Sequence, residues 1–331
     1  MPKRSDFKYL TMTKFEIKDG VAIIPEGTTE IPITAFRGCE KLRSVIIPRS
    51  VETIGDHAFV HCHSLENVVI HNGVKIIGCG AFSSCTALKS ITIPDSVTDI
   101  GYDVFAGCFS LECISGKFAT EYNRALVVDG ELIAVATNGL TEYRIPNSVT
   151  SIGYGAFIGC DTLRSIHIPD SVKEIGEFAF YGCVSLQSIT IPEGVTKIGE
   201  STFSDCTSLQ SISLPESIAD FGDRAFSYCE SLQTISIPKC VDNIGGYAFY
   251  GCSNLKSIII PERVVNIENM SFVDCASLEV VTLLGRSKIS YSAFTNCNSL
   301  MTINVPTGTA DYYKEHLPET LRQFVLESPF G

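Results

Sequence analysis

Residues 168–190 have the sequence IPDSVKEIGEFAFYGCVSLQSIT, and nearly the same sequence recurs before and after them at a fixed interval. Phenylalanines measure the interval: they are 23 residues apart from Phe36 to Phe105 and again from Phe157 to Phe272. A cysteine follows each of them by three residues, and a leucine follows each cysteine by three more. A period of roughly 20 to 50 residues is typical of a stacked-repeat protein, in which neighbouring units complete one another's core.

Each repeat contains one short segment that predicts a β-strand. In the unit after Phe157, residues Leu163, Ile166 and Ile168 have the spacing L-x-x-I-x-I, which alternates like a strand over its last three positions. Stacking one such strand per coil predicts a parallel sheet that runs the length of the molecule. Pro169 and Gly176 are expected to turn the chain, since proline fixes φ and glycine tolerates positive φ.

The pattern C-x-x-L-x-x-I-x-I-P-x-x-V-x-x-I-G-x-x-A-F resembles the BspA-like class of leucine-rich repeat, and the resemblance covers about residues 17–306. It implies a β-rich, right-handed solenoid with one continuous parallel sheet and short turns or 3-10 segments on the other side. BspA-like proteins are similar to bacterial surface proteins that attach cells to host matrix or to other cells. The resemblance therefore implies binding or adhesion, and no enzymatic activity.

The period defines three segments: an N-terminal extension over 1–16, the solenoid over 17–306, and a C-terminal cap over 307–331. One coil, 116–139, is atypical because the phenylalanine and cysteine landmarks disappear. Within it Asp129-Gly130 lies between two apolar runs, which predicts a two-residue hairpin. This hairpin is either an insertion that binds a partner or an insertion that is tolerated without having a function.

The C-terminal segment is expected to close the exposed end of the stack. Thr309 is a candidate N-cap for a first short helix that carries Tyr312, Tyr313 and Leu317, and Pro318 is placed to begin a second one. An uncovered end would leave a row of unpaired backbone groups, which promotes aggregation.

Charge and composition exclude several classes of function. A net charge of −12 argues against a nucleic-acid surface, which requires basic side chains to neutralise phosphates. Tryptophan is absent, and most phenylalanines belong to the repeat. The sequence as given shows no secretory signal and no run of about 20 apolar residues that would insert into a membrane. It therefore predicts a cytoplasmic protein, whereas the family resemblance implies the alternative of a secreted or cell-surface protein.

Eleven of the 14 cysteines occupy the repeat position after phenylalanine. We expect them to form a buried, reduced column, since free cysteine is among the most buried residue types and parallel Cβ bonds suit a disulfide poorly. Cys183→Ser is then expected to destabilise the protein, because the hydroxyl would lack a hydrogen-bonding partner. Cys79, Cys113 and Cys240 lie outside the column and are the thiols expected to react.

The densest cluster of chemically active side chains lies between His57 and Cys79, where His61, Cys62 and His63 are consecutive. A metal site requires such groups to converge at about 2 Å. Cys62 should point inward and the flanking histidines outward, so we expect no metal site and no catalytic thiol. The glycines follow neither phosphate-binding spacing. We predict no cofactor and no catalytic residues.

Outward-facing positions of the predicted sheet form a neutral strip rich in hydroxyl and amide groups, about 60 Å long if about thirteen strands stack at the usual spacing. Such strips are either simply solvated or bind partners, because solenoids present extended surfaces. The candidate partner-binding residues have long side chains that supply both contact area and hydrogen-bonding groups. They are Arg164, His167, Gln187, Gln210, Gln233 and Lys256.

The sequence therefore predicts a monomeric binding repeat protein that recognises a protein or glycan through the exposed sheet face. Two alternatives remain open. One is an intracellular scaffold with an unknown partner. The other is a thiol- or metal-dependent enzyme that uses the region from His57 to Cys79.

Overall fold

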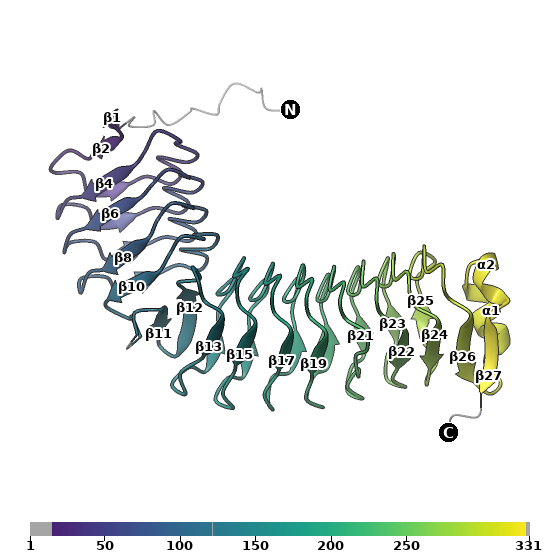
Figure 1. Ribbon diagram of the computed structural model, residues 1–331. Coiled ribbons are helices and arrows are strands. Elements are labelled where there is room, and N and C mark those ends of the chain that lie inside the picture. Colours follow the sequence, from purple (N-terminus) through teal and green to yellow (C-terminus); the bar gives the residue numbers. More distant parts are fainter. Residues whose placement is uncertain (1–14, 121, 329–331) are drawn as a thin grey trace, which may run out of the picture. The chain divides into compact units, whose positions relative to one another are not determined.

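The computed structural model describes residues 15–120 and 122–328. Nearly all of the extension predicted over 1–16 lies outside these described residues. The chain divides into two compact units, which are treated separately below. Unit 1 comprises the chain up to Leu126 together with Ala134–Ala136, and unit 2 comprises Val127–Ile133 together with the chain from Thr137 onward. In both units each coil of the chain stacks on the next, as a solenoid (Figure 1).

Unit 1 has two rows of strands, because each coil contributes one strand to each row. The first row follows the predicted strand of the repeat and consists of β1 (Glu16–Lys18), β2 (Val21–Ile23), β4 (Ser44–Ile47), β6 (Asn67–Ile70), β8 (Ser90–Ile93) and β10 (Cys113–Gly116). The second row consists of two-residue strands, namely β3 (Glu30–Ile31), β5 (Thr53–Ile54), β7 (Ile76–Ile77) and β9 (Asp99–Ile100). Only β1 and β2 pair in antiparallel fashion among the named strand pairs of these rows.

Unit 2 repeats this arrangement. Its first row consists of β13 (Glu142–Arg144), β15 (Ser165–His167), β17 (Ser188–Thr190), β19 (Ser211–Ser213), β22 (Ser257–Ile260), β24 (Val280–Leu283), β26 (Thr302–Pro306) and β27 (Val325–Ser328). Its second row consists of β14 (Ser151–Ile152), β16 (Glu174–Ile175), β18 (Lys197–Ile198), β20 (Asp220–Phe221), β21 (Asn243–Ile244), β23 (Asn266–Ile267) and β25 (Lys288–Ile289).

The leucine-rich repeat solenoid with parallel sheets is confirmed, with two differences in detail. The first row is divided into separate ladders instead of one continuous sheet; in unit 2 they are β13-β15-β17-β19 and β22-β24-β26-β27. The opposite side, expected to hold turns or 3-10 segments, carries the second row of parallel two-residue strands. A two-residue strand is too short to show alternation, so hydrophobic periodicity could not reveal it.

The core of each unit is a stack of phenylalanines beside a column of cysteines. In unit 2 the ring centroids of Phe180 and Phe203 are 5.3 Å apart and their planes differ by 4°. The predicted burial of the cysteine column is confirmed for ten of the eleven repeat cysteines, with Cys39 at the start of the column only half-buried. Offset ring stacking adds to the energy of burial, so the column phenylalanines tie each coil to its neighbour.

The buried thiols have hydrogen-bond acceptors, which the sequence did not indicate. Sγ of Cys183 donates to the carbonyl of Phe157, in the preceding coil of the stack, at 3.3 Å. Sγ of Cys206 donates in the same way to the carbonyl of Phe180 at 3.2 Å. The premise that a hydroxyl at position 183 would lack a partner is therefore wrong.

The repeat glycine after the second-row isoleucine has a different role from the one expected. Gly176 is not among the glycines with positive φ. A Cβ at this position would lie 2.6 Å from the amide nitrogen of Tyr154 in the preceding coil. Glycine is needed here because the backbones of adjacent coils approach too closely for a side chain.

The predicted hairpin is present. Its strands are β11 (Ala125–Val128) and β12 (Glu131–Val135), and Asp129 and Gly130 both have positive φ, at 48° and 85°. These values suit a type I′ turn, which favours Asp-Gly. The tip of the hairpin belongs to unit 2, where β12 pairs in parallel with β14.

The C-terminal end is covered by two short helices, α1 (Ala310–His316) and α2 (Glu319–Arg322), and also by strand β27, which extends the first-row ladder. Tyr313 of α1 is fully buried, and its hydroxyl donates to the carbonyl of Gly285 at 2.7 Å. Thr309 is the N-cap residue of α1, as expected, but its hydroxyl donates to the carbonyl of Pro306 instead of accepting from the helix. Oε1 of Glu327 on β27 accepts from the amide of Ala310 at 3.1 Å.

Candidate functional site

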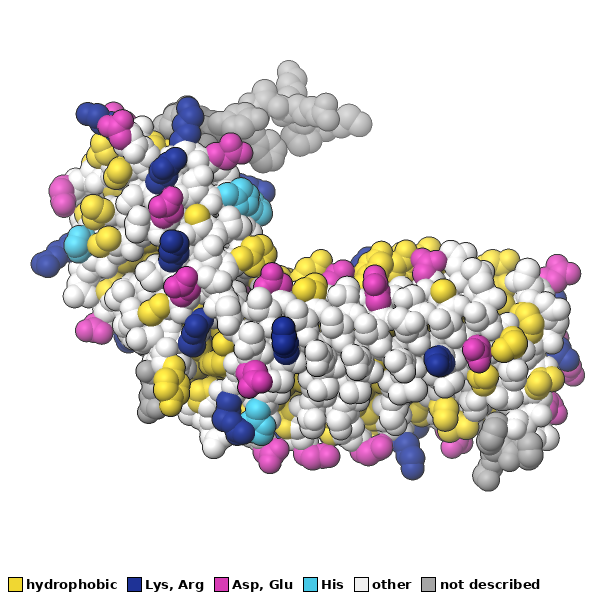
Figure 2. Space-filling view, viewed as in Figure 1, with side chains coloured by type: hydrophobic (Ala, Val, Ile, Leu, Met, Phe, Trp, Pro, Cys, Tyr) yellow, Lys and Arg dark blue, Asp and Glu magenta, His cyan; other side chains and the backbone are white. Residues whose placement is uncertain are grey.

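The six predicted partner-binding residues lie along the first strand row of unit 2, and all six are exposed. We call them the glutamine strip: Arg164, His167, Gln187, Gln210, Gln233 and Lys256. Parallel pairing holds their coils in register, with Ser165 opposite Ser188 and Ser188 opposite Ser211. Figure 2 shows this face over β17 and β19 as largely free of charged and hydrophobic side chains.

The side chains of the glutamine strip have no hydrogen-bonding or ionic partners elsewhere in the described part of the chain. Their backbones are engaged: the amide of Gln187 donates to the carbonyl of Arg164 at 3.2 Å, and the amide of Gln210 to that of Gln187 at 2.9 Å. The scaffold therefore fixes the origin of each side chain while its polar end stays available to a partner.

Two features interrupt the regularity of the strip. Residues 232–238, which include Gln233, are described but not assigned to a strand, and they separate the ladder ending at β19 from the one beginning at β22. At the opposite end His167 pairs in register with Arg144, so two basic side chains lie side by side. The strip is therefore neutral in its middle and basic at this end.

The first row of unit 1 carries an exposed apolar stripe that was not predicted from the sequence. Ile23, Ile46 and Val69 are 44%, 50% and 45% exposed, and Ile46 lies opposite Val69 in the β4–β6 ladder. Beside them the exposed residues Arg43 and Glu66 alternate in charge. An exposed apolar surface rimmed by polar residues marks binding sites in soluble proteins. A signal was available, because these three residues occupy the outward position that holds threonine or serine in other coils.

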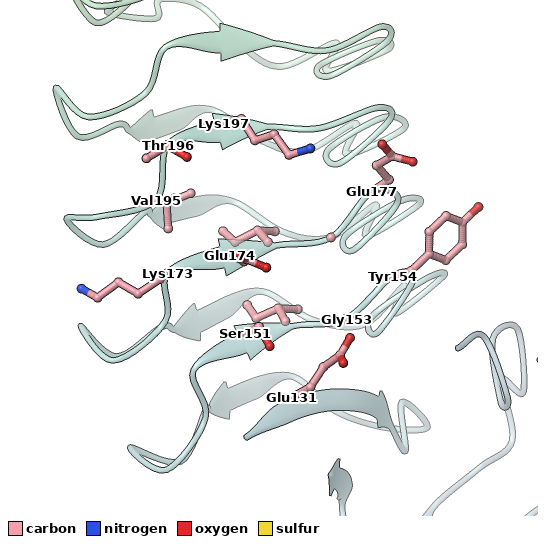
Figure 3. Close-up of a pocket in the computed structure, with 13 residues that line it drawn as sticks. Glu131, Ser151, Gly153, Tyr154, Lys173, Glu174, Glu177, Val195, Thr196 and Lys197 are labelled. Carbon is pink, nitrogen blue, oxygen red and sulfur yellow. The ribbon is translucent and has the colours of Figure 1, made fainter. Parts of the chain in front are cut away.

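A shallow depression of about 380 Å³ lies on the second strand row of unit 2 (Figure 3). Its charged lining includes Glu174 and Lys197 from two strands of the row, and Glu131 from the hairpin strand β12, which pairs with β14. The labelled side chains in Figure 3 point in different directions, with Lys173 directed away from Glu177. Groups that do not converge cannot act together on one substrate, so we assign no chemistry to this depression.

The cluster between His57 and Cys79 does not assemble into a site. Cys62 is fully buried, its thiol donates to the carbonyl of Phe36 at 3.0 Å, and burial raises its pKa to about 12. His61 and His63 are exposed on either side of it, as expected. Within 15–120 and 122–328, no group of three or more His, Cys, Asp or Glu side chains is placed to hold a metal ion. A protonated, buried thiol is inert, so the geometry lends no support to the thiol- or metal-enzyme alternative.

Comparison with known families gives one match, to the BspA type leucine rich repeat region, in six copies over residues 5–122, 135–242 and 220–320. Repeat scaffolds of this type are generally non-catalytic. A search of curated proteins gave no match.

Three bacterial crystal structures show the same fold. A leucine rich cell surface protein from Faecalibacterium prausnitzii is 26% identical, with 90% of this chain and 94% of that chain covered and a TM-score of 0.58. A leucine-rich repeat protein from Bacteroides ovatus is also 26% identical, with 93% and 94% covered and a TM-score of 0.55. The pneumococcal vaccine antigen PcpA is 22% identical, with 92% and 73% covered and a TM-score of 0.66, which bears on the fold alone.

Neither helix of the described residues has the length and apolar character needed to span a lipid bilayer.

Proposed function

The chain belongs to the BspA type leucine rich repeat family, and we propose that it is a monomeric, non-catalytic recognition protein that binds a protein partner through the outward face of its first strand row. The observation that carries this proposal is the glutamine strip, six exposed side chains along the first strand row of unit 2 that have no side-chain partners among the described residues. Within the family scaffold, we propose the bounds 17–306 for the solenoid and 307–331 for its cap.

The first row supports protein recognition better than recognition of a charged polymer. In unit 2 the strip supplies amides that donate and accept hydrogen bonds, and in unit 1 the apolar stripe of Ile23, Ile46 and Val69 supplies surface that gains from burial. Protein interfaces combine an apolar centre with a polar rim. We propose that each unit carries its own binding patch, the glutamine strip in unit 2 and the apolar stripe in unit 1. A protein partner binds one of these two patches.

We further propose that the protein acts at the cell surface. The support is the Faecalibacterium prausnitzii protein, which is described as a cell surface protein and is similar over 90% of this chain. Protease treatment of intact native cells, with a lysed control and mass spectrometry of the released peptides, tests this. Peptides from intact cells are expected; peptides that appear only after lysis would favour the intracellular scaffold instead.

The binding face is tested by changing Gln187, Gln210 and Gln233 together to glutamate. These side chains are exposed and have no partners within residues 15–120 and 122–328, so the fold should be unaffected. Three new charges at the centre of a contact should weaken binding at least tenfold, because like charges or unpaired charges at an interface are costly. Binding is measured by surface plasmon resonance against a panel of purified extracellular matrix proteins.

A matched control places three glutamates near the second row of the same unit, at Thr196, Ala219 and Val265. Equal loss of binding in both variants would indicate a general charge effect and contradict the proposed face. Saturable binding that survives the glutamine-strip variant, but is lost on changing Ile46 and Val69 to serine, would move the site to unit 1.

A further inference from the structure

From Phe36 to Phe105 and from Phe157 to Phe272, the turn segment around each column phenylalanine contains two residues in the left-handed region, two positions before and two positions after the phenylalanine. Glycine is the residue best suited to this conformation, and other residues pay about 1 kcal/mol or more. One part of unit 2 fills these positions with large side chains: Phe178, Arg224, Tyr228, Tyr247 and Met270, with φ between 55° and 59°. Unfavourable backbone positions that hold large side chains are often explained by function.

These large side chains flank a coil whose own turn segment carries small side chains. In the coil of Phe203 the two left-handed positions hold Ser201 and Asp205. Ser204 directly follows the phenylalanine, where Tyr181 and Tyr250 stand in other coils, and Ser201 and Ser204 are only 2% and 3% exposed. Larger residues stand on both sides, with Phe178 and Tyr181 on one wall and Arg224, Tyr228, Tyr247 and Tyr250 on the other. The result is an open notch of about 750 Å³, which we call the aromatic notch. Figure 2 shows hydrophobic side chains gathered along this edge of the unit.

The rings of the walls support one another. On the first wall the rings of Phe178 and Tyr181 are 6.0 Å apart and tilted by 52°. On the second wall the rings of Tyr228 and Tyr250 are 5.1 Å apart and nearly perpendicular, at 78°. The guanidinium of Arg224 lies 4.8 Å from the centre of the Tyr247 ring. Mutual packing of this kind holds aromatic surfaces in place before a ligand binds.

The floor of the notch is polar. Asp205 projects from it, and Oδ2 of its carboxylate accepts a hydrogen bond from the hydroxyl of Ser204 at 3.0 Å. Burial, together with the nearby charge and hydrogen bonding of Asp205, raises the pKa of the Tyr181 phenol. Glu200 also lines the notch. The lining therefore holds two carboxylates, one guanidinium and several hydroxyl groups.

The backbone of the floor is not available to a ligand. The amides of Ser201, Phe203 and Asp205 donate to carbonyls of the next coil at 2.8 to 2.9 Å. The carbonyl of Ser204 accepts from the preceding coil, at 2.9 Å from the amide of Gly182. A peptide therefore cannot bind here as an added strand, which is the mode that uses free backbone groups.

We propose that the aromatic notch binds a neutral oligosaccharide, with a pyranose ring against the tyrosine and phenylalanine walls and its hydroxyl groups bonded to Asp205, Glu200 and Arg224. A sugar ring combines an apolar C–H face with a rim of hydroxyl groups, each both donor and acceptor, and this is the chemistry that the walls and floor present. Charges of both signs in the lining give no reason to expect a strongly charged polymer.

The test is binding of the full chain to an array of neutral oligosaccharides, with hits measured by isothermal titration calorimetry. We expect at least one saturable ligand, and an affinity at least tenfold lower for Tyr181→Ala and for Tyr247→Ala. Ser204→Tyr should abolish binding by filling the notch. The fold accepts tyrosine at this repeat position, since Tyr181 and Tyr250 occupy it in other coils. Tyr291→Ala, at a tyrosine that is 75% exposed outside the notch, should bind normally.

Several outcomes would overturn the proposal: an array without ligands, a ligand whose affinity the three notch variants do not change, or binding of proline-rich peptides alone. The glutamine-strip variant should retain full oligosaccharide binding, because its three changes lie on the first strand row. Loss of sugar binding in the notch variants and loss of protein binding in the strip variant can thus be observed independently.

Discussion

Replacing Asp103 with asparagine should stabilise the protein at neutral pH. Asp103 is half-buried in unit 1, and its Oδ1 is buried without a hydrogen-bond partner within the described residues. Its φ is 59°, in the left-handed region that asparagine tolerates well. The substitution keeps the shape of the side chain and removes the charge, so it isolates the cost of burying a carboxylate.

Burial raises the pKa of Asp103 from 3.8 to about 6, and the nearby His57 opposes the rise. A difference of one pKa unit corresponds to about 1.4 kcal/mol, so full burial would imply a cost of about 3 kcal/mol for the charged form. The side chain is partly exposed and solvent screens its charge, so we expect about 1 kcal/mol. The folded state binds the proton more tightly than the unfolded state, so this cost is complete above about pH 6 and disappears as the pH falls towards 4.

The assay is urea denaturation of the full chain at a series of pH values from 4 to 8. Asp103→Asn should unfold at higher urea concentration than the parent at pH 8, and the gap should narrow as the pH falls. Any gain from the left-handed backbone should not depend on pH, and Asp95→Asn, at an exposed position, serves as control. A gap that is the same at all pH values, or a variant that is less stable at pH 8, would refute the reasoning.

Three further predictions concern the core columns. Phe203→Ala should lower the free energy of unfolding by about 3 to 5 kcal/mol, because it removes a buried ring between two stacked neighbours; a loss below about 1 kcal/mol in urea denaturation would mean the coils collapse around the gap. Cys183→Ser should cost only about 1 kcal/mol, since the carbonyl of Phe157 offers an acceptor; a much larger loss than for Cys183→Ala would show that the hydroxyl cannot reach it. Native alkylation followed by mass spectrometry should modify only the half-buried thiols, because the other thiols are buried and burial raises the pKa of column cysteines such as Cys252. Early labelling of Cys252 would contradict this. The thiols expected to react are Cys39, Cys79, Cys113 and Cys240.

The stacked fold and its core could be predicted because the repeat is nearly one-dimensional: each coil contacts only its neighbours, so one period determines most of the packing. The period placed Phe203 and Cys183 in the core, where the structure has them. The same logic placed Gln187 and Gln210 outside, where they are exposed. The hairpin at Asp129-Gly130 was predictable for a different reason, because that dipeptide encodes its own turn.

What could not be predicted depends on contacts between coils or across the cap. Gly176 is required by the backbone of the coil before it, at a distance that no local pattern encodes. The side chain that accepts from the α1 N-terminus is that of Glu327, which follows Ala310 by 17 residues, whereas Thr309 holds the N-cap position without a side-chain bond to the helix. The acceptor for Cys183 lies 26 residues away, for the same reason. Each of these three contacts forms only when the coils and the cap have stacked on one another.

The candidate sites show where a repeat sequence conceals its function. Core positions recur in every coil, so the repeat pattern identifies them. The surface positions that differ between coils are not part of the pattern and are not identified by it. The left-handed turn positions need not be filled by one residue type, because the ladder of the turn uses only their backbone atoms: the amide of Phe178 donates to the carbonyl of Glu200, and that of Arg224 to the carbonyl of Gly246. Their side chains are thereby free to differ from coil to coil. The large aromatic residues beside Ser201 and Ser204 include ones in a backbone conformation that favours glycine, and the packing of the core does not require them. This is the strongest reason to look for a ligand there.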